Sequence, residues 1–103
     1  MKIYKLSQNI NNGYDTYDSV VVVAENEDDA KRIHPSESWW DGGFYDEEKK
    51  EFWTHYSGSS KTYLFEDKWG TWTNDLSKIK VEYLGEAEPH LKRGVVVASF
   101  CAG

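Results

Sequence analysis

The sequence has a single cysteine, few prolines and no long apolar run. Cys101 cannot form an internal disulfide, which fits a reducing compartment. The longest strictly apolar runs, Val20–Ala24 and Val95–Ala98, are far shorter than the ~20 residues that a membrane-spanning helix needs. Met1–Ile10 also lacks the apolar segment of a signal peptide. We therefore expect a cytoplasmic protein that is neither secreted nor inserted in a membrane.

Basic residues are in the minority. The chain has 12 lysines and arginines against 18 aspartates and glutamates, for a formal net charge of -6. A negative protein repels phosphate backbones, so we expect no direct binding to nucleic acid. The mean hydropathy is low, at -0.75, but 16% aromatic residues are too many for a disordered chain. A length of 103 residues predicts one domain, residues 1–103.

Motifs for metal binding and catalysis are missing from the sequence. His34, His55 and His90 have no close partner at the spacing of a zinc site, and no segment has the pattern of a calcium loop. No nucleophile elbow, Walker loop or dinucleotide-binding glycine motif is present. We expect no metal, no cofactor and no enzymatic activity. An enzyme would have to use His34, His55 or Asp15, the only candidate catalytic groups.

The residues that are present divide the chain into a sheet core, 1–38 and 79–103, around an insertion at 39–78. Hydrophobic patterns predict four core strands, at Lys2–Leu6, Ser19–Ala24, Ile79–Leu84 and Val95–Phe100. The second and the last are apolar on both faces, which is typical of strands buried inside a sheet.

A short helix is predicted at about residues 26–34. Asn26 is a favourable N-cap, and Glu27, Asp28 and Asp29 suit the positive end of the helix dipole. Pro35 disfavours helical conformation at the residue before it and ends the element. The predicted class is therefore α+β: a small, mainly antiparallel sheet with one short helix and an inserted aromatic-rich hairpin.

The inserted hairpin consists of two aromatic-rich runs, Glu51–Tyr56 and Lys61–Glu66, joined by Ser57–Ser60. Because hairpins at a surface tolerate change better than the sheet that carries them, we expect the segment Phe44–Phe65 to be separable from the core.

All five tryptophans lie in the insertion, interleaved with carboxylates. The simplest interpretation is that most of them pack against the sheet. The alternative is a surface for a basic partner, since tryptophan and tyrosine dominate binding hot spots and carboxylates add charge complementarity. The predicted partner-binding residues are Trp39, Trp40, Asp41, Tyr45, Glu47, Glu48, Glu51, Trp53, Trp69 and Trp72.

A second possible site lies in the N-terminal zone. Aromatic and carboxylate side chains alternate there, and this pattern is most often one arm of a hairpin after the turn at Asn11–Gly13. The other interpretation is a ligand site that sequesters a small nucleotide signal, formed by Tyr14, Asp15, Tyr17, Asp18 and Arg32.

Several blocks outside the insertion resemble a family of small uncharacterised proteins from bacteriophage and prophage genomes. They are the KIYKLSQ start, the YDTYDS block, IHPS, IKVEYLGEA and the GVVVASFCAG end. The resemblance implies no catalytic residues. It implies a phage accessory protein in the bacterial host cytoplasm that inhibits a host defence factor, as anti-CRISPR and other counter-defence proteins do. The implied partner is a host protein with a basic surface, such as a nucleic-acid-binding defence protein.

Overall fold

The structure is a computed structural model, and it describes residues 1–9, 16–37, 43–54, 62–63 and 72–101. Its larger sheet contains four antiparallel strands in the order β6-β1-β2-β7. These are the four predicted strands, with bounds β1 Lys2–Gln8, β2 Thr16–Ala24, β6 Ile79–Glu86 and β7 Gly94–Cys101. The predicted α+β class is confirmed.

The helix α1 is shorter than predicted and spans Glu27–Lys31. Its start is as expected, because the Asn26 side chain accepts a hydrogen bond from the Asp29 backbone N–H at 2.9 Å. Arg32 is the C-cap residue, so the helix ends before Pro35 is reached. This early end directs Ile33 and His34 into the core, where both are buried.

The smaller sheet lies within the insertion and has the strand order β3-β4-β5. The predicted hairpin is confirmed as β4 Glu51–Thr54 and β5 Thr62–Tyr63, which pair antiparallel. Its connecting residues, Ser57–Ser60 included, lie outside the described part of the chain. The strand β3 Gly43–Asp46 has no clear sequence signal and pairs with β4 through a turn at residues 47–50. A single 3-10 turn, Leu76–Lys78, leads into β6.

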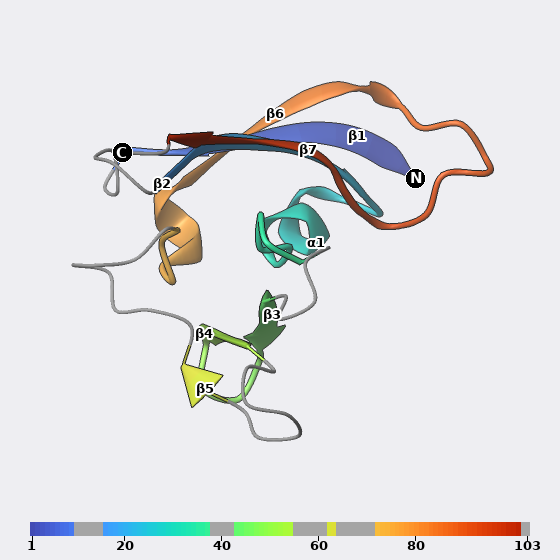
Figure 1. Cartoon of the computed structure of the whole chain (residues 1–103). Coiled ribbons are helices and arrows are strands. Elements are labelled where there is room, and N and C mark those ends of the chain that lie inside the picture. Colours follow the sequence, from blue (N-terminus) through green and yellow to red (C-terminus); the bar gives the residue numbers. More distant parts are fainter. Residues whose placement is uncertain (10–15, 38–42, 55–61, 64–71, 102–103) are drawn as a thin grey trace.

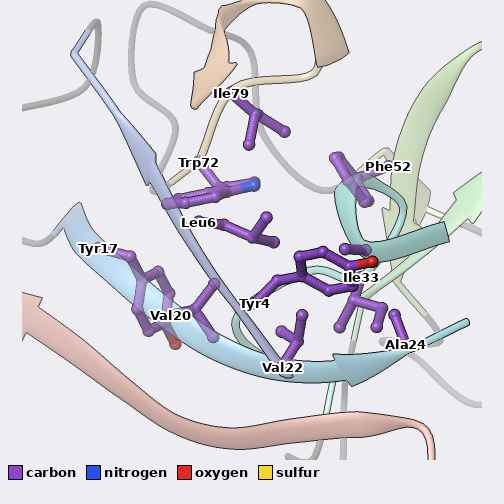
Figure 2. Close-up of a cluster of buried hydrophobic side chains, with 11 residues drawn as sticks. Tyr4, Leu6, Tyr17, Val20, Val22, Ala24, Ile33, Phe52, Trp72 and Ile79 are labelled. Carbon is purple, nitrogen blue, oxygen red and sulfur yellow. The ribbon is translucent and has the colours of Figure 1, made fainter. Parts of the chain in front are cut away.

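The two sheets lie on opposite sides of α1 (Figure 1). Side chains from both halves of the chain meet in one buried cluster between them (Figure 2). The cluster consists of Tyr4, Leu6, Tyr17, Val20, Val22, Ala24, Ala30, Ile33, Phe52, Trp72 and Ile79. No described element covers the other face of the large sheet (Figure 1).

The insertion is not separable from this core, contrary to the sequence-based expectation. Phe52 of β4 is 1% exposed and Trp72 is 2% exposed, and both belong to the cluster that contains Leu6 and Val20. The large sheet offers too small an apolar face to close a core by itself. It therefore uses aromatic side chains of the insertion as the opposite wall.

The prediction that β7 is buried on both faces is also wrong. β7 is an edge strand, with Val96 56% and Val97 59% exposed, while Val95 and Ala98 pack against the core. An apolar run indicates a strand but does not tell an edge strand from an interior one. In the interior strand β2, Val21 is only half-buried, because it faces the uncovered side.

Candidate functional site

A hollow of about 500 Å³ lies where the end of α1, the β3–β4 turn and the segment before β6 meet. Two hydrogen bonds hold that last segment in place. The Asn74 Oδ1 accepts from the Phe52 N–H at 2.8 Å, and the Gln8 Oε1 accepts from the Thr73 N–H at 2.9 Å. The lining residues are Arg32, Tyr45, Glu47, Lys50, Asn74, Asp75, Leu76 and Ser77.

Arg32, Tyr45 and Glu47 form the centre of this region. The Arg32 Nε donates to the Glu47 Oε1 at 2.6 Å, and its Nη1 donates to the Asp28 carbonyl oxygen at 2.8 Å. The guanidinium carbon lies 5.5 Å from the centroid of the Tyr45 ring, a cation–π arrangement. The Glu47 side chain remains 68% exposed, so it can meet a further cation from outside.

The β3–β4 turn presents Glu47 and Glu48 to solvent. The Asp46 Oδ1 accepts from the backbone N–H of Glu48 at 3.0 Å and of Lys49 at 3.1 Å, while the Lys50 N–H donates to the Asp46 carbonyl oxygen at 2.7 Å. Lys50 has a φ of 55°, in the left-handed region that disfavours residues other than glycine. The turn is therefore tightly specified, and both glutamates are exposed.

A second hollow, of about 390 Å³, lies on the other side of the same three residues. It adds Asp29, Glu37, Phe44 and Arg93 to its lining. The Arg93 Nε donates to the Asp29 Oδ1 at 2.8 Å, and its Nη1 lies 3.8 Å from the Glu37 Oε2. Burial raises the pKa of the Glu37 carboxyl, although the Arg93 guanidinium acts in the opposite direction. The wall of this hollow thus combines three carboxylates, two guanidinium groups and two aromatic rings.

The predicted partner-binding residues fall into three groups. Tyr45 and Glu47 line both hollows, and Glu48 is exposed on the same turn. Glu51 and Trp53 follow on β4 and are half-buried, with the Lys49 Nζ 5.5 Å from the Trp53 ring centroid. Outside the described residues lie Trp39, Trp40, Asp41 and Trp69.

Trp72 is the one predicted contact residue that the structure places in the core. It is 2% exposed and packs with Leu6 and Ile79, so it has no surface to offer a partner. The apolar face of the sheet needs a large side chain at this point, and Trp72 supplies it.

The alternative ligand site is not assembled. Tyr17 is 4% exposed in the core, its ring edge-to-face with His34 at 6.2 Å. Asp18 is exposed beside β7, where it accepts from the Ser99 hydroxyl at 3.3 Å, whereas Arg32 contacts Glu47. A register shift between Tyr17 and Ser19 turns neighbouring side chains away from each other. Tyr14 and Asp15 lie outside the described residues.

His34 cannot serve as a catalytic acid or base at neutral pH. It is 1% exposed, and burial lowers its pKa to about 3. The Ser36 backbone N–H donates to its Nδ1 at 3.0 Å, so the proton of the neutral ring lies on Nε2. His55 and Asp15 lie outside the described residues. Within the described residues, no three histidine, cysteine or acidic side chains come together in a group that could hold a metal ion.

Arg93, Asp29 and Asp75 are site residues that sequence reasoning missed. Arg93 precedes β7 and is 64 positions from Asp29, so no local pattern connects the two. Asp75 has a local signal, because it is followed at once by a short turn whose Ser77 N–H it accepts at 3.0 Å. These hydrogen bonds from Ser77 lower the pKa of the Asp75 carboxyl.

No protein-family model matches this chain, and neither the curated proteins nor the solved structures give a significant match. The resemblance to phage proteins therefore stays a prediction. None of the helices described here has the length and apolar character needed to span a membrane.

Proposed function

We propose that this chain is a non-enzymatic accessory protein of the phage type that inhibits a host defence factor by binding it. The partner is a protein with a basic surface, such as a nucleic-acid-binding defence protein, and the setting is the bacterial host cytoplasm. The contact surface is the rim formed by Tyr45, Glu47 and Glu48 above the two hollows.

The observation that carries this proposal is the position of Glu47. It is bound to Arg32 at 2.6 Å, yet 68% of its side chain faces solvent, beside the half-buried ring of Tyr45. A lysine or arginine of a partner could contact this carboxylate and the neighbouring aromatic ring together, which is the combination found at binding hot spots. Carboxylates on the rim would also accelerate association with a basic surface.

A comparison of two charge-reversed variants tests the proposal. Glu47→Lys/Glu48→Lys changes the rim, whereas Glu82→Lys/Glu88→Lys makes the same change in net charge at exposed positions on and after β6. Both are used to capture proteins from bacterial lysate and to protect a phage from a defended host strain. We expect the first variant to lose capture and protection, and the second to retain both. Equal behaviour of the two variants would contradict the proposal.

A second candidate is a sponge for a small nucleotide signal, located in the larger hollow rather than at the predicted site. Its volume of about 500 Å³ falls in the range of small-molecule sites, and Arg32 and Lys50 lie on its wall with the Tyr45 ring. Native mass spectrometry of the purified protein separates the two candidates. A bound nucleotide that is lost in Lys50→Glu supports the sponge, and empty protein with no thermal shift from cyclic nucleotides argues against it.

A further inference from the structure

The outer edge of β7 is unlike that of an ordinary protected edge strand. Within the described residues β7 pairs with β2 alone, so its other edge leaves backbone N–H and C=O groups unpaired. Its eight residues, Gly94–Cys101, include no charged side chain and no proline. The opposite edge strand, β6, contains the charged residues Lys80, Glu82 and Glu86, which discourage pairing with another chain.

Exposed apolar side chains accompany this open edge. Val96 is 56% exposed and Val97 is 59% exposed, the largest values among the big apolar residues that the structure describes. They are adjacent because of a register shift: Val97 pairs with Val21 and Val95 with Val22, leaving Val96 as the extra residue. Burial of two such side chains would favour association.

Charge selects a second copy of this chain as the occupant. The chain has a net charge of -6, so two copies repel each other over most of their surfaces. β7 itself is uncharged. Lys92 and Arg93 precede its first residue, and Asp18 lies beside its last turn of sequence, accepting from Ser99 at 3.3 Å. Antiparallel pairing of two β7 strands brings the basic end of each copy to the acidic end of the other.

We propose that two copies of this chain associate through antiparallel pairing of their β7 strands, which joins the two large sheets into one continuous sheet across a twofold axis. Such an interface is self-complementary, because the same edge is used by both copies. Backbone hydrogen bonds between the strands fix the register, and Val96 and Val97 supply the buried apolar surface. The dimer uses different residues from the Tyr45, Glu47 and Glu48 rim, so it does not depend on the function proposed above.

Sedimentation equilibrium of the full chain over a range of concentrations tests this proposal. The wild type should shift from 11.9 kDa towards twice that mass as the concentration rises. Val97→Lys should remain at the monomer mass, since it places a charge at the centre of the pairing edge. The matched control is Leu84→Lys, which adds the same charge at a 49% exposed position on β6 and should dimerise like the wild type.

Hydrogen exchange on the unmodified chain gives a second readout that needs no substitution. Amide protection in Gly94–Cys101 should increase with protein concentration, while protection in β6 should not change. A wild type that stays at 11.9 kDa up to its solubility limit would overturn the proposal, including the case in which β7 pairs with a strand of another protein. So would a dimer that survives Val97→Lys but dissociates in Leu84→Lys.

Discussion

His34 and Phe52 lie edge to face in the core, with ring centroids 5.1 Å apart and planes at 72°. His34 follows α1, and Phe52 belongs to β4, so this contact joins the insertion to the large sheet. The stacking continues on both sides, to Tyr17 of β2 at 6.2 Å from His34 and to Tyr45 of β3 at 5.1 Å from Phe52. Packing in the core therefore fixes the position of the Tyr45 ring at the candidate binding surface.

Phe52→Ala should destabilise the whole domain and not the insertion alone. Removal of a buried phenylalanine ring costs about 3–5 kcal/mol. We expect one cooperative unfolding transition in urea, with a midpoint well below that of the wild type. Tyr83→Ala, at a 52% exposed aromatic position, is the control and should lower the midpoint much less. An unchanged midpoint for Phe52→Ala would mean that the small sheet folds independently.

The buried His34 makes the free energy of unfolding depend on pH. Its pKa is about 3 in the folded chain against a model value of 6.5, so below pH 6.5 the unfolded state binds a proton that the folded state does not. Its contribution is complete above pH 6.5 and is lost as the pH falls towards 3. Between pH 7 and pH 5 we expect a loss of about 2 kcal/mol.

Urea unfolding at both pH values measures this loss, with His34→Leu as the comparison. The variant should show a weaker pH dependence over that interval, whatever its absolute stability. An equally steep dependence in His34→Leu would assign the effect to other groups.

Lys50→Gly should stabilise the chain. Lys50 adopts a φ of 55°, where a side chain costs about 1 kcal/mol relative to glycine. The comparison is Lys49→Gly at the preceding turn position, which lacks a positive φ and should not gain stability. Thermal unfolding followed by circular dichroism would show the difference, and a lower melting temperature for Lys50→Gly would contradict this account of the turn.

Local signals were sufficient to predict the four strands, the helix and the hairpin. The valines at 20–23, the Asn26 cap and Pro35 act within a few residues of themselves. The sequence also predicted Tyr45 and Glu47, because aromatic and acidic residues alternate there. Partners remote in sequence were not predictable. Glu47 meets Arg32 across 15 positions, and nothing near either residue indicates that contact.

The burial of Phe52 and the exposure of Val97 have the same origin. Both depend on which strands become neighbours and on which face another layer covers, and neither property is local. Hydrophobic periodicity distinguishes the two faces of a strand but not its place in the sheet order.

Asp substitutions should distinguish the two kinds of valine. Val22→Asp buries an unpaired charge at a fully buried position and should prevent folding. Val97→Asp leaves its carboxylate in solvent and should unfold at nearly the wild-type temperature. Loss of folding in Val97→Asp would mean that the uncovered face of the sheet is part of the core.

Site-specific photo-crosslinking tests the proposed binding surface most directly. A photoreactive side chain is placed at Glu48 on the rim or, as the control, at Glu82 on β6, and each protein is irradiated in bacterial lysate. We expect the Glu48 position to crosslink a basic host protein in a salt-sensitive manner, and the Glu82 position to give no such product. Crosslinking of the same protein from Glu82 but not from Glu48 would contradict the account.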